Sequence, residues 1–409
     1  MRVPSFHAFR CGRASVAASL ARLWSWGANN AGQLGLGDTT NRSSPVQVGA
    51  LTTWSNVFGG TNCSFATKTD GTLWAWGDNS NGKLGLGNIT YRSSPVQVGT
   101  LTDWSGATIS SRSDSTLAVK SNGTLWAWGA NEGGRLGLGD SYINRSSPVQ
   151  VGALTNWADV SVSKNNTLAV KTDGTLWAWG LNFYGQLGTG NTISRSSPVQ
   201  VGALTGWSKV VSTNTDTSLA LKTNGTLWSW GANESGQLGL GDSYINRSSP
   251  VQVGALTNWS KIAGAGSRYS YGDNIFASGF FSAIKTDGTL WSWGDNTYGK
   301  LGLGNTISRS SPVQVGALTT WSSLSINQAM NYKNTHNTAV IKTDGTLWAW
   351  GSNVTGSLAT GVTTPFRRSS PAQVLSGTSG WTSVSVICGK ASSYYSYLSR
   401  SSMLAIRTS

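Results

Sequence analysis

The sequence predicts an all-β fold: a seven-bladed β-propeller of four-stranded antiparallel blades. The string Leu-Trp-x-Trp-Gly occurs seven times, and the copies start at Leu23, Leu73, Leu125, Leu176, Leu227, Leu290 and Leu347. Successive starts are 50, 52, 51, 51, 63 and 57 residues apart. A period near 50 indicates one supersecondary unit copied along the chain. A lone four-stranded sheet cannot cover both of its faces, whereas sheets packed between two neighbours in a ring can.

The clearest copy, residues 157–201, contains four short runs of alternating apolar residues. The alternating residues are Val160 and Val162, Leu168 and Val170, Leu176 and Ala178, and Val199 and Val201. Alternation of period two, bounded by Gly, Asn, Asp and Pro, is typical of short strands. We therefore expect four strands per repeat, and no copy shows a helical period.

The residues between the runs support antiparallel strands. Asp-Gly or Asn-Gly, such as Asp173-Gly174, stands between the second and third runs in six copies. These dipeptides tolerate positive φ and suit two-residue hairpins. The proline of each Arg-Ser-Ser-Pro, such as Pro198, begins the fourth run. Because proline cannot donate to a ladder, we expect the fourth strand to be the outer edge of each blade.

The two ends of the repeat region predict how the ring closes. Residues 403–409 match a second strand and stop where the turn is expected, whereas the first copy begins at Arg22 with a third strand. We expect the last strand to pair with the first, so that one blade is built from both ends. The chain then consists of a non-repeat tail, 1–21, and a single propeller, 22–409. This closure also suggests that the chain is complete at its C-terminus.

Much of the unusual composition follows the repeat. The 21 Trp amount to three per copy, and we interpret them as packing between blades. The formal net charge is +14, but 14 of the 30 basic residues recur once per copy, in Arg-Ser-Ser-Pro or at the end of the second strand. Even spacing is weaker evidence for a polyanion site than a cluster on one face. Binding of nucleic acid therefore remains an alternative that we do not favour.

The residues outside the repeats say little about compartment. Residues 1–21 contain three Arg and no acid, and this pattern is compatible with a targeting segment, a tail or a misplaced start. No apolar run is long enough to span a membrane. Three Cys without Cys-x-x-Cys spacing exclude a disulfide framework or a zinc site of known pattern. We expect no cofactor and no metal, and we slightly favour an extracellular or virion location.

The repeat is similar to that of the regulator of chromosome condensation family. The resemblance lies in Leu-Trp-Ala-Trp-Gly-x-Asn-x-x-Gly-Gln-Leu-Gly-Leu-Gly-Asp followed by Arg-Ser-x-Pro-x-x-Val, and it covers residues 22–409. It implies a seven-bladed propeller closed by both termini. It also implies possible roles as a guanine-nucleotide exchange factor for a small GTPase, a chromatin-binding protein, a plant UV-B photoreceptor or a ubiquitin-ligase module. The near-identical copies resemble microbial or phage-type members.

This chain departs from the family before the second strand. Eukaryotic members usually carry Gly-x-x-His-Thr there, and only residues 335–338 (Thr-His-Asn-Thr) keep part of that pattern. The exchange-factor face is therefore not reproduced residue by residue. The photoreceptor's Trp cluster belongs to the same segment, where this chain has no Trp.

The first-to-second-strand segments differ most between copies. From the first-strand Trp to the second-strand basic residue, the spans are 14, 16, 14 and 15 residues in four copies and then 26, 21 and 26. The three long segments are consecutive, so we expect them to form one arc of loops on one face. Their non-repeat residues are the predicted binding residues: Tyr269, Tyr271, Phe276, Phe280, Phe281, Tyr332, Lys333, His336, Tyr394, Tyr395, Tyr397 and Arg400.

Two interpretations of this arc remain open. Tyr with Ser, Asn and Gly is typical of adaptable binding loops, and aromatic and Arg residues dominate interface hot spots. Alternatively, the rings pack on one another and stabilise long loops. Catalysis is disfavoured because the chain has two His, no Ser-His-acid order and no phosphate-binding loop. The sequence thus predicts a non-enzymatic scaffold for a protein or glycan partner, with an exchange-factor-like or polyanion-binding protein as the alternative.

Overall fold

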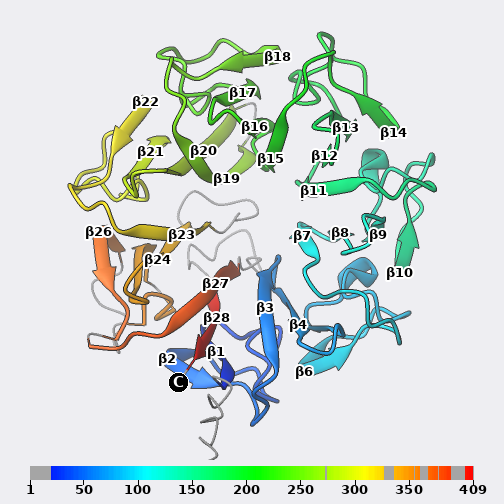
Figure 1. The fold of residues 1–409 in the computed structure, drawn as a ribbon, viewed down its shortest axis with the longest axis vertical. Coiled ribbons are helices and arrows are strands. Elements are labelled where there is room, and N and C mark those ends of the chain that lie inside the picture. Colours follow the sequence, from blue (N-terminus) through cyan, green and yellow to red (C-terminus); the bar gives the residue numbers. More distant parts are fainter. Residues whose placement is uncertain are drawn as a thin grey trace, which may run out of the picture.

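The computed structural model describes residues 20–271, 274–326, 336–353, 355–359, 367–375, 377–387 and 401–408. In this part of the chain, seven four-stranded antiparallel sheets stand radially around an axis (Figure 1). The predicted seven-bladed propeller is confirmed. Apart from strands, the described residues form two short 3-10 turns, η1 (Ser80–Gly82) and η2 (Glu132–Gly134).

Each blade has an inner, a second, a third and an outer strand, named by position from the axis. The inner strands are β3 (Trp54–Gly59), β7 (Thr108–Arg112), β11 (Trp157–Val162), β15 (Trp207–Ser212), β19 (Trp259–Tyr271), β23 (Trp321–Ile326) and β27 (Trp381–Ile387). The second strands are β4 (Cys63–Lys68), β8 (Ser115–Val119), β12 (Asn166–Lys171), β16 (Thr217–Lys222), β20 (Asn274–Lys285), β24 (Asn337–Lys342) and β28 (Ser402–Thr408).

The other two strands complete each blade. The third strands are β5 (Leu73–Gly77), β9 (Leu125–Gly129), β13 (Leu176–Gly180), β17 (Leu227–Gly231), β21 (Leu290–Gly294), β25 (Leu347–Ser352) and β1 (Ala21–Gly27). The outer strands are β6 (Arg92–Gln97), β10 (Arg145–Gln150), β14 (Arg195–Gln200), β18 (Arg247–Gln252), β22 (Arg309–Gln314), β26 (Arg367–Gln373) and β2 (Arg42–Gln47). The outer strand is an edge strand in every sheet, as its proline predicts.

The turns between the second and third strands need their glycines. In the β11–β14 blade, Gly174 has a φ of +77°, and a Cβ at that position would lie 2.7 Å from the backbone nitrogen of Gly206 in the connection to the next blade. The turn residue is therefore fixed twice, by left-handed backbone and by close approach of another chain segment.

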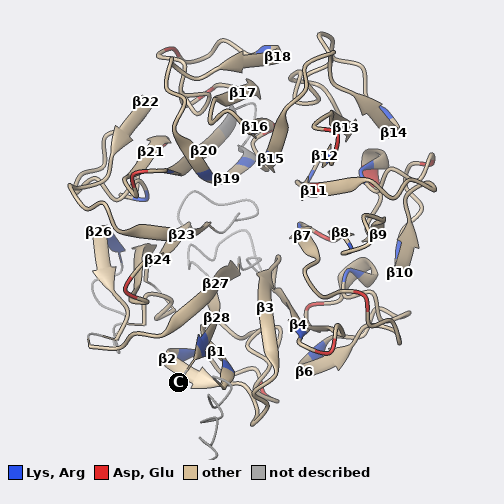
Figure 2. Cartoon of the chain, viewed as in Figure 1, with Lys and Arg blue, Asp and Glu red and all other residues tan. Residues whose placement is uncertain are grey.

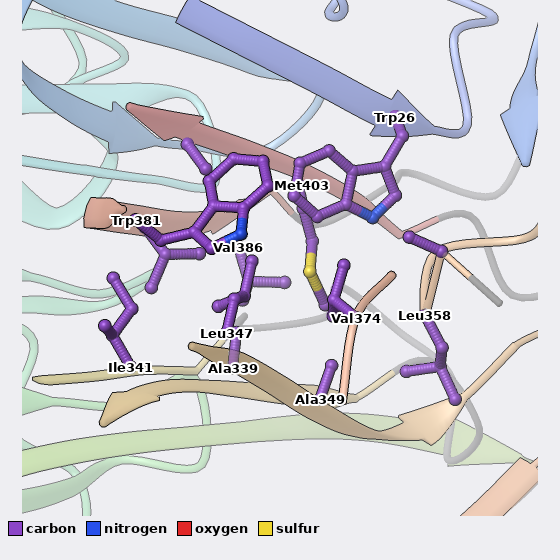
Figure 3. Close-up of a cluster of buried hydrophobic side chains, with 13 residues drawn as sticks. Trp26, Ala339, Ile341, Leu347, Ala349, Leu358, Val374, Trp381, Val386 and Met403 are labelled. Carbon is purple, nitrogen blue, oxygen red and sulfur yellow. The ribbon is translucent and has the colours of Figure 1, made fainter. Parts of the chain in front are cut away.

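The ring closes between the two ends of the chain, as predicted. Strand β28 pairs with β1 in antiparallel register from Ala21↔Thr408 to Gly27↔Ser402. The closing blade therefore reads β27-β28-β1-β2. Its buried face meets the β23–β26 blade in an apolar cluster that includes Trp26, Trp381 and Met403 (Figure 3). This closure leaves no open seam in the ring.

The second Trp of each Leu-Trp-x-Trp-Gly joins neighbouring blades. Trp179 is fully buried, and its indole Nε1 donates to the backbone oxygen of Arg135 in the preceding blade at 2.9 Å. At the closure, Trp26 donates in the same way to Ser357 at 3.0 Å. A buried Trp removes about 200 Å² from water, and its N–H has a partner in the adjacent blade. The prediction that Trp packs between blades is thus confirmed.

The basic residue that ends each second strand lies against Trp rings, a role that the sequence did not suggest. Lys171 Nζ is 3.7 Å from the ring centroid of Trp177 and 5.0 Å from that of Trp157. Equivalent contacts are made by Lys68, Lys120, Lys222, Lys285, Lys342 and Arg407. Burial lowers the pKa of Lys171 from its ordinary value, with Asp173 opposing that effect. Seven positive charges therefore belong to cation–π packing inside the blades.

Candidate functional site

Two kinds of connection lie at one end of every blade, which we call the loop face: the inner-to-second-strand turns and the third-to-outer-strand loops. Contacts across blade junctions confirm that they adjoin. Lys83, in a third-to-outer loop, has its Nζ 2.9 Å from an oxygen of Asp114, in the inner-to-second turn of the next blade. The opposite end, the turn face, carries the Asp/Asn-Gly turns and the connections between blades. The predicted binding residues that the structure describes belong to the loop face.

The first of the three long segments is an extended hairpin rather than a loop. Strands β19 and β20 pair continuously from Lys261↔Ile284 to Tyr271↔Asn274. Gly264 and Phe281 occupy the positions of Val162 and Thr167 in the β11–β14 blade, as their pairing registers show. Residues 265–280 therefore replace the four-residue turn 163–166. The 12 additional residues, the difference between spans of 26 and 14, lengthen both strands and carry the blade's own pairing outward.

Arg268 holds this extension against two preceding blades. Its Nε lies 3.4 Å from Asp216 Oδ2, and its Nη2 donates to Glu234; both acids belong to the β15–β18 blade. Its guanidinium carbon is 3.8 Å from the ring centroid of Tyr184, in the β11–β14 blade. The planar guanidinium thus contacts two carboxylates at its edge and one aromatic ring on its face, a combination that suits Arg better than Lys. We call these four residues the Arg268 latch.

Asp216 is the buried centre of the latch. Its side chain is 1% exposed, and burial raises its pKa, an effect that Arg268 and the amide of Asn165 oppose. Asn165 Nδ2 donates to Asp216 Oδ1 at 2.7 Å, and Gln186 Nε2 donates to the same oxygen at 3.1 Å. The carboxylate thus depends on donors from the adjacent blade and from the hairpin, and it couples the hairpin to the ring.

Close backbone packing adds to the latch. Ser235 Oγ donates to the backbone oxygen of Ala277 at 2.8 Å. A Cβ at Gly266 would lie 2.6 Å from Thr215 Cγ2, so only glycine lets the hairpin approach the neighbouring turn this closely. These contacts hold the extension against the β15–β18 blade.

Three of the predicted binding residues are buried in packing. Phe280 and Phe281 are 0% exposed and His336 is 3% exposed. Phe281 stacks on Trp293 with ring centroids 5.9 Å apart, and Phe280 meets His336 edge-on at 5.5 Å. For these three residues the geometry agrees with the packing interpretation of the sequence.

The other predicted residues lie at the end of the hairpin or outside the described residues. In the backbone register Tyr269 pairs with Phe276, and Tyr271 pairs with Asn274 at the tip. The hairpin thus brings three of the predicted aromatic residues together from two strands. The remaining predicted residues fall outside the residues that the structure describes: Tyr332, Lys333, Tyr394, Tyr395, Tyr397 and Arg400.

Sequence reasoning missed the latch, although a signal was present. Arg268, Glu234 and Tyr184 stand at positions that differ from copy to copy. Each is a long side chain on the loop face, but only the fold shows that Glu234 and Tyr184 both contact Arg268, beside Asp216.

The described residues contain no group of three or more His, Cys, Asp or Glu that could hold a metal ion. No helix in this part of the chain is long and apolar enough to cross a membrane. Lys and Arg are distributed around the ring and do not gather in one blade (Figure 2). The loop face is distinguished by its extended hairpin and its buried ion pairs.

Comparison with known families identifies the repeat. The regulator of chromosome condensation (RCC1) repeat matches residues 21–67, 70–118, 122–170, 173–217, 224–271 and 287–326. This chain belongs to the RCC1-repeat family. Among curated RCC1 relatives, the ultraviolet-B receptor UVR8 of Arabidopsis thaliana is 31% identical over 344 residues, which are 82% of this chain and 74% of the receptor.

Two further relatives place the RCC1 propeller in other proteins. The probable E3 ubiquitin-protein ligase HERC6 of Homo sapiens is 29% identical over 210 residues, half of this chain but only 20% of the ligase. The solved structure of Prp20p from Saccharomyces cerevisiae, described with its binding to Gsp1p and histones, has a TM-score of 0.74 and 19% identity. The match covers 96% of this chain and 92% of Prp20p, and at that identity it shows the shared RCC1 fold.

Proposed function

We propose that this RCC1 propeller is a non-enzymatic scaffold that binds a protein partner on its loop face, centred on the extended β19–β20 hairpin. The observation that carries the proposal is the Arg268 latch. A surface hairpin 12 residues longer than its counterpart would lose conformational entropy on binding. Its attachment by ion pairs to one blade and by a cation–π contact to another lowers that loss beforehand. A relative supports a binding role, because the Prp20p structure is described with its binding to Gsp1p and histones.

The partner surface extends from the hairpin tip toward the next two blades. The β23–β26 blade and the closing blade follow the β19–β22 blade around the ring. Both carry the lengthened segments of the sequence, with Tyr332, Lys333, Tyr394, Tyr395, Tyr397 and Arg400 as proposed contact residues. Tyr and Arg supply large rigid contact areas and planar hydrogen bonding, the usual content of hot spots.

A hairpin graft tests this proposal. Residues 265–280 are replaced by the sequence of residues 163–166, so that the β19–β22 blade takes the turn of the β11–β14 blade. Proteins captured by the intact chain are identified, purified and titrated against both forms. We expect the graft to weaken binding at least tenfold while it stays folded by circular dichroism, with a lower melting temperature because it removes buried Phe280 and the Arg268 partner of Asp216. A purified partner that binds both forms equally would exclude the hairpin as its site.

Two further measurements separate other outcomes. A glycan array on which the intact chain binds and the graft does not would replace the protein partner by a carbohydrate. Release of guanine nucleotide from a small GTPase by the intact chain would favour an exchange-factor-like role. Location on a cell or virion surface stays a prediction; tail or capsid genes beside this gene would support it.

A further inference from the structure

The outer part of the loop face carries large apolar side chains that no packing explains. They occur in the third-to-outer-strand loops of five consecutive blades, from β3–β6 to β19–β22. Their exposed fractions lie between 52% and 80%, and the residues are Ile89, Tyr91, Tyr142, Ile143, Phe183, Ile193, Tyr244, Ile245 and Ile307. We call these residues the rim tips. The sequence gives little indication of them, because the lengths of these loops differ by only one or two residues between copies.

Two rim tips are held in an unfavourable backbone conformation. Tyr142 and Tyr244 have φ values of +75° and +64° and are 73% and 80% exposed. A left-handed backbone at a bulky residue is uncommon, and it persists only where the surroundings enforce it. Here the backbone N–H of Tyr142 donates to Asn131 O at 2.9 Å, and that of Tyr244 donates to Asn233 O at 2.7 Å. Both blades thus present a Tyr-Ile pair on a rigid loop.

Around the same rim, arginines that form an ion pair alternate with arginines that do not. Arg42, Arg145 and Arg247 each lie 2.6 Å from an Asp of their own loop. In the alternate blades Asn88, Asn191 and Asn305 replace those Asp residues. Among the described residues no carboxylate lies within ion-pair distance of Arg92, Arg195 or Arg309. The rim therefore combines apolar tips with three positive charges that no acid neutralises, on a chain of net charge +14.

We propose that the rim tips dock this propeller onto an anionic lipid bilayer. The tips belong to equivalent loops of one rigid ring, so they lie at similar height and are spread over five blades. Protein hot spots cluster at the centre of a patch, whereas a surface that meets five separate tips at once must be broad and flat. Ile side chains have no π-face for stacking on nucleobases, but they suit the acyl boundary. Tyr lies favourably at the headgroup level, and unpaired Arg is attracted by anionic lipids. This inference is independent of the hairpin's partner.

Vesicle co-sedimentation of the full chain tests the proposal at low and physiological salt. The probes are phosphatidylcholine vesicles with and without about 30 mol% phosphatidylserine. We expect binding to the anionic vesicles only. The variant Tyr142→Ser, Ile143→Ser, Tyr244→Ser, Ile245→Ser should bind at least tenfold more weakly. Its matched control removes four exposed Leu from the turn face (Leu154→Ser, Leu204→Ser, Leu256→Ser, Leu318→Ser) and should bind as the wild type does.

The chain's own alternatives test the charges. Asn191→Asp with Asn305→Asp gives two blades the Asp-Arg pair that neighbouring blades already contain, and it should weaken vesicle binding at least tenfold. Asn122→Asp with Asn224→Asp adds the same charge on the turn face, where other copies have Asp, and should have less than half of that effect on a logarithmic scale. No binding to anionic vesicles, or equal binding of the tip variant and its control, would overturn the proposal. So would binding of a single-stranded oligonucleotide that the tip variant loses while vesicles remain unbound.

The two proposals fail separately. The hairpin graft should keep vesicle binding, and the tip variant should keep binding to a protein partner of the hairpin. If the graft alone abolished vesicle binding, the rim tips would not be the docking surface.

Discussion

The β11–β14 and β19–β22 blades are built from nearly the same sequence, yet they differ on the loop face. Both have a Lys between two Trp, a buried Trp bonded to the preceding blade and an Arg-Ser-Ser-Pro edge strand. The β11–β14 blade closes its inner hairpin in four residues, whereas the β19–β22 blade continues for 16 and reaches two blades back. The common part maintains the ring, and the part that differs is the surface for which we propose a binding role.

The largest effect should come from the common part, and it should be equal in both blades. Trp179→Ala and Trp293→Ala each remove a fully buried indole and its inter-blade hydrogen bond. We expect each substitution to lower the free energy of unfolding by about 4 kcal/mol, measured by guanidinium titration. Trp177→Ala, at a half-buried ring, serves as the milder control. A much smaller loss at Trp293 would mean that the extended hairpin has taken over part of the blade's packing.

The second comparison concerns the residue beneath the buried Trp of the next blade. In the β11–β14 blade this residue is Gln186, and the residue five positions before it is Leu181. In the β19–β22 blade the same two positions hold Lys300 and Asp295, and Lys300 Nζ lies 2.5 Å from Asp295 Oδ2. Lys300→Gln alone leaves a carboxylate that is 9% exposed without its cation and should cost about 3 kcal/mol. Asp295→Ala with Lys300→Gln recreates the Ala232–Gln237 arrangement and should recover most of that loss.

A double-mutant cycle measures this coupling. Unfolding of the wild type, both single variants and the double variant gives the interaction energy of the pair. Equal destabilisation by Lys300→Gln and by the double variant would contradict this explanation, because removal of the unpaired carboxylate would then recover no stability.

The fold was predictable from the sequence because the residues that its turns and edge strands require recur along the chain. A tight turn needs Asp-Gly, an edge strand tolerates proline, and a ring needs a strand from each end. The same regularity concealed other roles. The periodic Lys could be described only as evenly spaced charge, since alternation alone cannot show that Lys171 lies between Trp157 and Trp177. The Asp295–Lys300 spacing was visible, but its meaning required the blade junction.

The candidate site was less predictable for a physical reason. Segment length located the hairpin, but a count of residues does not distinguish a loop from two longer strands. Phe280 and Phe281 were predicted from their residue type, and they are buried because the hairpin's pairing carries them into the junction. The Arg268 latch joins residues 34 to 84 positions apart in the chain, and no local pattern specifies such a meeting.

The latch should have a local effect of intermediate size. Arg268→Ala removes the cation beside Asp216 and should weaken attachment of the hairpin by about 2 kcal/mol, while the melting temperature changes little. Hydrogen exchange at the amides of residues 265–271 and 274–280 measures this opening. Lys261→Ala, at an exposed cation of the same strand, is the control. Unchanged protection in the Arg268 variant would show that backbone pairing alone holds the hairpin.

Low pH should lower the free energy of unfolding through Asp295, a carboxyl that the β11–β14 blade lacks at the equivalent position. Burial alone would raise the pKa of this carboxyl, but Lys300 and hydrogen bonds from Ser278 and Thr297 hold it well below the ordinary value. The unfolded chain therefore binds this proton first as the pH falls, so stability is lost below about pH 4, at up to about 1.4 kcal/mol per pH unit. The double variant Asp295→Ala, Lys300→Gln lacks this carboxyl, and its unfolding midpoint should fall less steeply in acid. Parallel acid limbs would contradict the assignment.

The smallest effect should come from the cations between Trp rings, again equally in both blades. Lys171→Met and Lys285→Met keep an unbranched apolar side chain that is only one atom shorter, but they remove the charge 3.7 Å from a Trp centroid. Each should cost about 1 kcal/mol, because the contact is partly desolvated. Burial lowers the pKa of both lysines, so part of the attraction is already offset by lost hydration. If Met stabilised either blade, that desolvation would exceed the cation–π gain, and the seven periodic cations would then owe their presence to something other than stability.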